Sequence, residues 1–210
     1  MKAVLCFGDS NTNGARADEP QLGRLPAELR WPGRLRKLLG PRFEVLEEGL
    51  GGRTTDLDPP DLPGRNGRAY FGPCLLSHHP LAVVVLMLGT PDLKTRFART
   101  PAQIAGALDG YFDDVERFLG GRSRPQPRVI VVSPAHLGAV PTSAEYDAGS
   151  VRKSRELAGE LRAVAAGRGA GFLDAAAFAR VGGDGVHLDL ASHDALAARL
   201  APMVLDIGEP

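Results

Sequence analysis

Residues 81–88 read LAVVVLML, a run of eight apolar residues that has no polar position and ends at Gly89. A strand with one face in water alternates apolar and polar residues, so this run predicts a strand that is buried on both faces. Four shorter apolar runs lie at residues 3–7, 43–46, 129–132 and 171–173, and most of them have the same continuous character. We expect all five to be parallel strands of one central sheet.

The segments between these runs carry apolar residues at the three- and four-residue spacing of amphipathic helices. After Pro101, a residue favoured in the first turn of a helix, the pattern includes Ile104, Leu108 and Val115. The same spacing starts at Trp31, at Leu157 and at Leu196. Strands that alternate with helices build a parallel sheet covered by helices on both faces. The sequence therefore predicts one domain, residues 1–210, with a three-layer α/β/α sandwich fold.

Three long stretches have no regular pattern, at residues 11–29, 54–73 and 134–150. In a compact domain, connections of this length usually surround a functional site or form contacts between subunits. We expect the same of these three.

The charged residues balance, with 25 Lys and Arg against 25 Asp and Glu, and this argues against a dedicated nucleic-acid-binding protein. The two cysteines, Cys6 and Cys74, are too few for a disulfide framework and form no CxxC motif. The first apolar run is too short for a signal peptide, and no run approaches the ~18 residues of a membrane span. These features predict a cytoplasmic protein that binds neither nucleic acid nor membranes.

The first apolar run leads into FGDSNTNG at residues 7–14. A serine directly after the first strand of a parallel sheet, here Ser10, lies at the carboxyl edge where α/β proteins bind ligands. Two other interpretations of this segment remain open. Ser10 can be the cap of the next helix, or the segment can be a phosphate-binding loop like that of a flavodoxin. Asp9 argues against the second, because a carboxylate repels a phosphate dianion.

A second candidate for chemistry is GDGVH at residues 183–187. Asp184 and His187 are close enough to lie side by side in a turn, where the carboxylate accepts a hydrogen bond from Nδ1 of the imidazole. Nε2 is then free to take a proton from a serine, so Ser10, His187 and Asp184 form a complete set of nucleophile, base and orienting carboxylate. Alone, the Asp and the His are also consistent with a solvated turn. The glycine-rich EGLGGRT at residues 48–54 can turn backbone N–H groups toward an oxyanion, or can be a tight turn.

The chain resembles the SGNH (GDSL) hydrolases in four blocks that follow the family's order. They are GDS at residues 8–10, the glycine block that ends at Gly52, GTPD at 89–92 and DGVH at 184–187. The resemblance extends from residue 3 to about residue 200, and VLEEGL at 45–50 is similar to the arylesterase and acyltransferase branch. It implies a flavodoxin-like SGNH hydrolase fold with a central parallel sheet.

The resemblance also implies a role for individual positions. Ser10 is the expected nucleophile, His187 the base and Asp184 its orienting partner. The N–H groups of Ser10 and Gly52 are the expected oxyanion donors. The family's third block carries an Asn whose side chain is a further oxyanion donor, but Pro91 stands at that position. Proline has neither a side-chain donor nor an N–H group, and losing one such donor typically costs about 2.7–4 kcal/mol of transition-state stabilisation.

Two neighbours of the serine, Asn11 and Asn13, are candidate substitutes for the missing donor. The residue before a proline prefers an extended backbone, so we also expect Thr90 to leave its strand in an extended conformation.

The residues and the resemblance together predict a serine esterase of short-chain acyl esters, such as aryl or sugar acetates, that works through an acyl-enzyme. Water or another alcohol can resolve this intermediate, so acyl transfer is a second expected outcome. The alternative is a non-catalytic or nearly inactive ligand-binding relative with the same fold, weakened by Pro91. A flavin-binding module is a more distant alternative.

We expect no metal and no other cofactor. Asp56, Asp58 and Asp61 lie on one loop but lack the Gly and the terminal Glu of a calcium loop. The adjacent His78 and His79 point in different directions and cannot easily face one metal ion. The expected partners are a small-molecule ester and further copies of this chain, because members of the resembled family often form homo-oligomers.

Overall fold

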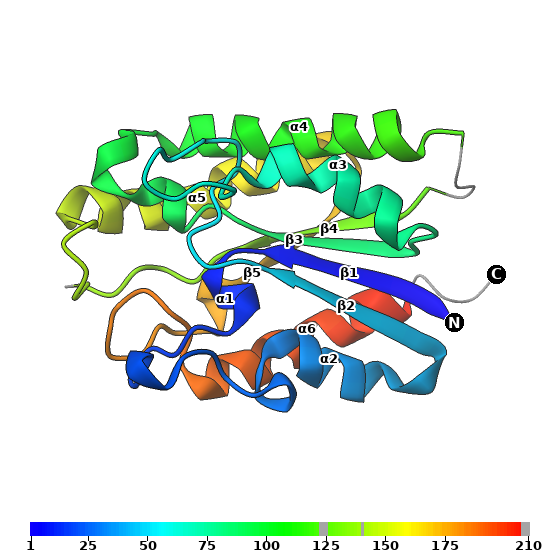
Figure 1. Cartoon of the computed structure of the whole chain (residues 1–210), viewed down its shortest axis with the longest axis horizontal. Helices are drawn as coiled ribbons and strands as arrows, with labels where there is room; N and C mark the ends of the chain where they lie inside the picture. Colours follow the sequence, from blue (N-terminus) through cyan, green and yellow to red (C-terminus); the bar gives the residue numbers. More distant parts are fainter. Residues whose placement is uncertain (122–125, 140, 207–210) are drawn as a thin grey trace.

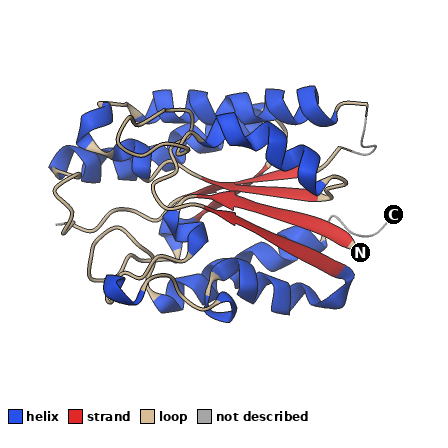
Figure 2. Ribbon diagram, in the orientation of Figure 1, coloured by secondary structure: helices blue, strands red, loops and turns tan. Residues whose placement is uncertain are grey.

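Five parallel strands form one sheet in the order β2–β1–β3–β4–β5 in the computed structural model, which describes residues 1–121, 126–139 and 141–206 (Figure 2). The strands are β1 (Lys2–Gly8), β2 (Phe43–Gly49), β3 (Val83–Met87), β4 (Arg128–Ser133) and β5 (Gly171–Asp174). Each of them coincides with one predicted apolar run, so the predicted parallel sheet is confirmed.

Helices cover both faces of this sheet (Figure 1). One face carries α3 (Gly67–His78), α4 (Pro101–Leu119) and α5 (Ala148–Gly167), and the other carries α2 (Trp31–Leu39) and α6 (Leu190–Leu205). The side chains of β1 alternate between the two cores: Leu5 and Phe7 pack on the α3–α5 side, and Val4 and Cys6 on the α2–α6 side. Residues 4–7 of this strand are all apolar because both of its faces are buried there. The predicted three-layer α/β/α sandwich is confirmed.

Helix α3 lies where the sequence has no helical pattern. It begins inside the stretch 54–73 and contains Pro73, which is unfavourable in a helix interior. Two local features explain the helix. Asn66 caps it by accepting a hydrogen bond from the Ala69 N–H group. Gly72 allows close packing on α4, because a Cβ atom there would lie 2.4 Å from the Phe118 ring.

The strand order creates a crevice at the carboxyl ends of β1 and β3. The chain passes from β1 to β2 on the α2 side of the sheet and then crosses to β3 on the α3 side. Such a reversal is the place where α/β sheets bind ligands. The register pairs Gly8 with Gly49 on β2 and with Met87 on β3, so the loops after these three strands meet at one edge.

The short helix α1 (Ser10–Asn13) follows β1 directly and lies at this edge (Figure 1). Within the described residues, no helix combines the length and the apolar composition that crossing a membrane requires.

Candidate active site

Ser10 is the first residue of α1 and has 7% of its surface exposed. Asp9 caps this helix, because its Oδ1 atom accepts a hydrogen bond of 2.9 Å from the N–H group of Asn11. The helix packs so closely on β1 and β3 that a Cβ atom on Gly8 would lie 2.1 Å from Thr12 Oγ1 and 2.6 Å from the Met87 carbonyl. These contacts fix the serine at the carboxyl edge of the sheet. The capping role expected as an alternative for Ser10 falls to Asp9 instead.

The structure brings together the serine, the histidine and the aspartate that the sequence singled out. His187 Nε2 lies 3.0 Å from Ser10 Oγ, although the two residues are 177 positions apart. His187 Nδ1 lies 2.6 Å from Asp184 Oδ2. The other carboxylate oxygen, Oδ1, accepts the N–H groups of Val186 and His187 at 2.8 and 2.9 Å. The carboxylate therefore orients the imidazole with its proton on Nδ1 and its free lone pair toward the serine.

The electrostatics of Asp184 suit this arrangement. Burial acts to raise the pKa of Asp184, but the hydrogen bonds from the His187 ring and from the backbone of His187 and Val186 outweigh it and lower the pKa below its usual value. The carboxylate is therefore ionised and accepts the hydrogen bond of the His187 ring.

Asn11 holds the loop that carries His187. Its Oδ1 atom accepts a hydrogen bond of 2.8 Å from the Leu188 N–H group, and its Nδ2 atom donates to the Val186 carbonyl at 3.5 Å. Asn13 donates its amide to the Gly49 carbonyl at 3.1 Å. Both amides are thus directed to backbone carbonyls, which corrects the expectation that either replaces the missing oxyanion donor. No local sequence signal indicated the role of Asn11, because its partners lie at the other end of the chain.

Arg53 connects the glycine-rich loop to the end of β1. Its Nη1 atom donates to the Gly8 carbonyl at 2.9 Å and also to the Glu48 carbonyl. The guanidinium lies 4.2 Å from the centre of the Phe7 ring, and burial lowers the pKa of Arg53. The preceding residue, Gly52, has a φ of +74°, a conformation that suits glycine. The tight turn expected for this loop is present, and Arg53 holds it beside the serine.

Asp92 supports the same loop from the other side. Its carboxylate accepts hydrogen bonds from the Thr55 N–H group at 3.0 Å and from Thr55 Oγ1 at 2.6 Å. The side chain is fully buried, and burial raises the pKa of Asp92 to about 7. Neither Arg53 nor Asp92 was identified from the sequence as a supporting residue, because each acts through a partner on a different loop.

Pro91 starts a short 3₁₀ turn, Pro91–Leu93. Thr90 has φ −58° and ψ −50°, so the expectation of an extended Thr90 is wrong. The carbonyls of Thr90 and Pro91 accept the N–H groups of Leu93 and Lys94, each at 3.2 Å. A proline is well suited to the first position of such a turn, and these bonds outweigh the usual preference of the residue before it.

These elements surround a cavity of about 390 Å³. Ser10, Gly52, Pro91 and His187 line it together, and Lys94 lies in its wall with its ammonium 2.7 Å from Glu145 Oε2. Thr142, Ser143, Glu145 and Tyr146 also line it, so the stretch 134–150, described apart from residue 140, contributes one wall as expected of a functional loop. A larger cavity of about 650 Å³ lies beside the starts of β1 and β2, at the opposite edge of the sheet from the serine.

Comparisons with known proteins agree with this geometry. Residues 6–196 match the GDSL-like lipase/acylhydrolase family. A solved structure of an aryl esterase from M. smegmatis is 38% identical, covers 99% of this chain and 100% of its own, and has a TM-score of 0.91. A carbohydrate acetylesterase from Sinorhizobium meliloti is 35% identical, with the same coverage of both chains and a TM-score of 0.91. No match is found among the curated proteins.

The family match spans most of the chain, and the two similar structures are esterases of nearly the same length. The alternative of a flavin-binding module has no support in these comparisons. The chain is an SGNH-type hydrolase and belongs to the GDSL-like lipase/acylhydrolase family, in its arylesterase branch.

Proposed function

We propose that this chain is a serine esterase that hydrolyses short-chain acyl esters, aryl or sugar acetates, with Ser10 as its nucleophile. The observation that carries the proposal is the continuous hydrogen-bonded series from Ser10 Oγ through His187 to Asp184, at the wall of a cavity. A nucleophile, a base and an orienting carboxylate in this order form the arrangement required for acyl transfer.

The proposed reaction has two halves. Ser10 Oγ attacks the ester carbonyl while His187 Nε2 takes its proton, and Asp184 stabilises the imidazolium that forms. His187 then returns the proton to the leaving alcohol, which departs and leaves the acyl group on Ser10. Water then attacks the acyl-enzyme in the same way, with His187 as the base, and the carboxylic acid is released. If another alcohol attacks in place of water, the same intermediate transfers its acyl group to that alcohol.

Charge develops on the carbonyl oxygen in both halves, and we assign its stabilisation to the N–H groups of Ser10 and Gly52. Both residues line the cavity, and Arg53 holds their loops together. Pro91 lines the same cavity but offers no donor. We therefore expect a slower reaction than a site with three donors would give.

The size of the cavity supports a small substrate. A volume of about 390 Å³ is near the lower end of the 300–1,000 Å³ that is usual for small-molecule sites. The two similar structures are an aryl esterase and a carbohydrate acetylesterase, which is the reason for proposing these two ester classes here. The kcat/KM for an aryl acetate and for an acetylated sugar, measured side by side, chooses between them.

The test of the nucleophile compares wild type with Ser10→Ala. Wild type should turn over p-nitrophenyl acetate and should be labelled once by an organophosphonate. The variant should lose both properties and keep its fold, because removing one hydroxyl at the surface of a cavity changes stability little. Labelling that persists in Ser10→Ala would place the nucleophile elsewhere.

One observation favours a second candidate, a nearly inactive ligand-binding relative: the absence of a donor at Pro91. Wild type that turns over the ester no faster than Ser10→Ala would support that candidate. In that case ligand binding in the cavity would be the property left to measure.

A further inference from the structure

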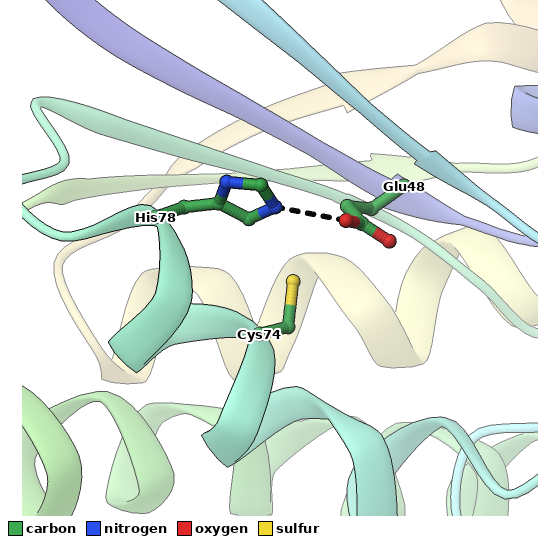
Figure 3. A group of neighbouring side chains, drawn as sticks. All are labelled: Glu48, Cys74 and His78. Carbon is green, nitrogen blue, oxygen red and sulfur yellow. Dashed lines mark hydrogen bonds and ion pairs between the residues drawn. The ribbon is translucent and has the colours of Figure 1, made fainter.

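A group of three reactive side chains lies outside the cavity, between β2 and α3 (Figure 3). Glu48 comes from the carboxyl end of β2, and Cys74 and His78 come from α3. Their ligand atoms all lie within 4.8 Å of one another, and no other group of three His, Cys, Asp or Glu residues in the described part of the chain meets this condition. Glu48 Oε1 and His78 Nε2 are 2.8 Å apart.

We propose that Glu48, Cys74 and His78 form a binding site for a zinc ion. Zn²⁺ accepts carboxylate oxygen, thiolate sulfur and imidazole nitrogen, and this group offers one of each. Typical bond lengths of 2.0–2.3 Å in a tetrahedral site place the ligand atoms roughly 3.3–3.6 Å apart. Glu48 Oε1 and His78 Nε2 are slightly closer than this, at 2.8 Å, and no two of the three ligand atoms are more than 4.8 Å apart, so small rotations of the side chains suffice to bind an ion.

The backbone already holds the ligands in the required arrangement. Cys74 and His78 are four residues apart on a helix, so they project from the same face. Figure 3 shows the Cys74 thiol pointing from α3 toward the space beside the Glu48–His78 pair. The adjacent strand supplies Glu48, so all three ligands come from regular elements and none from a mobile loop.

Tyr70 provides an outer contact of the kind that orients metal ligands. Its hydroxyl donates to Glu48 Oε2 at 3.3 Å, while Oε1 of the same carboxylate is directed at His78. Hydrogen bonds of this type fix the direction in which a ligating carboxylate presents its free oxygen.

Burial and ligand chemistry indicate which kind of ion fits. The side chains of Glu48 and His78 are 21% and 27% exposed, which leaves a path from solvent, and the Cys74 residue is 1% exposed. The thiol releases its proton to solvent when an ion binds. One sulfur, one nitrogen and one oxygen ligand favour Zn²⁺ over Mg²⁺ or Ca²⁺, which take oxygen ligands.

The chain provides matched controls for two ligands. Cys6 is the second cysteine, also buried, and it lies on β1 in the core on the other side of the sheet. His79 follows His78 directly but occupies the position after the end of α3. Cys74→Ala can thus be compared with Cys6→Ala, and His78→Gln with His79→Gln.

The experiment titrates protein treated with a chelator, first with ZnCl₂ by calorimetry and then with CoCl₂ by absorption. We expect one ion per chain, a thiolate-to-Co²⁺ charge-transfer band, and a melting temperature that rises with added Zn²⁺. Cys74→Ala should lose the band. His78→Gln should weaken Zn²⁺ binding by more than the 10–100-fold that is typical of losing an outer contact. Cys6→Ala and His79→Gln should behave as wild type.

Three results would overturn the proposal. The first is a wild-type protein that binds no Zn²⁺ in calorimetry and shows no Co²⁺ band. The second is equal Zn²⁺ binding by His78→Gln and His79→Gln, and the third is a Co²⁺ band that survives in Cys74→Ala, with circular dichroism confirming that each variant is folded. None of these measurements depends on esterase activity, so they stand apart from the test of Ser10.

Discussion

Asn11 is next to the serine in the sequence, yet its side chain is bound to the loop that carries the histidine. The amide contacts the backbone on both sides of His187, through the Val186 carbonyl and the Leu188 N–H group. A nucleophile and a base that come from opposite ends of the chain need a connection of this kind to keep their separation. We therefore assign Asn11 a positioning role in the proposed reaction.

Replacement of Asn11 tests this role. Asn11→Ala removes both contacts and should lower kcat for p-nitrophenyl acetate about tenfold with little change in KM, because misplacement of a catalytic group by about 1 Å can cost up to 10²-fold. Asn11→Asp keeps the acceptor for the Leu188 N–H group, so its kcat should fall less than that of Asn11→Ala. Equal kcat values for Asn11→Ala and wild type in a steady-state assay would remove the positioning role.

The residues of the candidate site form two groups: those that lie in a recognisable local pattern, and those that act through contacts with distant residues. Ser10, Asp184 and His187 could be predicted because each lies in a short pattern with its own chemistry: a serine directly after a strand, and an Asp and a His three residues apart. Arg53 and Asp92 could not be predicted, since Arg53 connects its loop to Gly8, 45 residues away, and Asp92 accepts hydrogen bonds from Thr55, 37 residues away. Patterns within one segment carry no information on such contacts.

At the scale of elements, α1 depends on a glycine of the neighbouring strand. A Cβ atom on Gly49 would lie 2.2 Å from the backbone nitrogen of Asn13 and 2.5 Å from the carbonyl carbon of Thr12. Backbone atoms cannot move aside as the end of a side chain can. In the same loop, a Cβ atom on Gly51 would meet nothing within 4 Å.

Gly49→Ala should therefore displace α1 together with Ser10. We expect a loss of about 1–3 kcal/mol in the free energy of unfolding, as is typical of overpacking, and a fall in esterase activity. Gly51→Ala should stay within about 0.5 kcal/mol of wild type. Urea denaturation of the two variants checks this, and equal midpoints would show that the contact between α1 and β2 is loose.

Elements could be predicted where burial requires a run of apolar residues. They could not be predicted where packing against a distant segment determines the structure. Strands β3 and β4 are buried along almost their whole length and β1 over residues 4–8, so each is visible in the sequence as an apolar run. Helix α3 includes Gly72 and Pro73, which weaken any helical pattern, and it is held by its cap and by its packing on α4. The four-residue spacing of Cys74 and His78 has a meaning only on a helix, and the sequence pattern does not predict α3. For this reason the sequence does not indicate that the two residues share one face.

The 3₁₀ turn at Pro91 carries the position at which the resemblance to the family implies an asparagine. Pro91 lines the cavity with Ser10 and Gly52, and Thr90 has a helical conformation that any residue adopts without strain. An asparagine at position 91 can therefore occupy the first position of the turn without a change of backbone. Its amide would be a further donor close to the developing oxyanion.

Pro91→Asn should raise kcat about tenfold with little change in KM, because the added donor acts on the transition state more than on the bound ester. The gain falls short of the 10²–10³ associated with deleting such a donor, since removal of proline also loosens the turn. Pro91→Ala isolates that loosening and should give no gain. If a folded Pro91→Asn variant has the same kcat as Pro91→Ala, a missing donor does not limit the reaction.

At the scale of the whole molecule, the fold brings three loops of different sequence together at one edge of the sheet. The strand order 2-1-3-4-5 puts the reversal of direction beside β1, so the serine, the glycine loop and the Pro91 turn, which follow β1, β2 and β3, meet at this edge. Homo-oligomer formation and a cytoplasmic location stay predictions, because both depend on surroundings outside this single chain. Sedimentation of the purified protein tests the first.

The same close packing buries a carboxyl group in the core, with a consequence for the stability of the entire fold. Asp9 is fully buried, and burial raises the pKa of Asp9 from 3.8 to about 6. Well below pH 3.8 the group is protonated in both the folded and the unfolded chain, so it has no electrostatic effect on stability. As the pH rises toward 6, the unfolded chain releases this proton while the folded chain retains it. Folding therefore becomes less favourable.

Asp9→Asn removes this ionisation and keeps an oxygen that can cap α1, since asparagine is as good a capping residue as aspartate. The variant should gain stability relative to wild type as the pH rises from about 4 to about 6, and the difference should then stay constant. A shift of about two pKa units corresponds to about 3 kcal/mol at full extent. Urea unfolding of both proteins across this range measures the difference directly. A difference that is flat with pH, or that falls as pH rises, would mean that Asp9 is ionised in the folded protein throughout, with its charge compensated by the hydrogen bond from the Asn11 N–H group and by the Arg53 guanidinium.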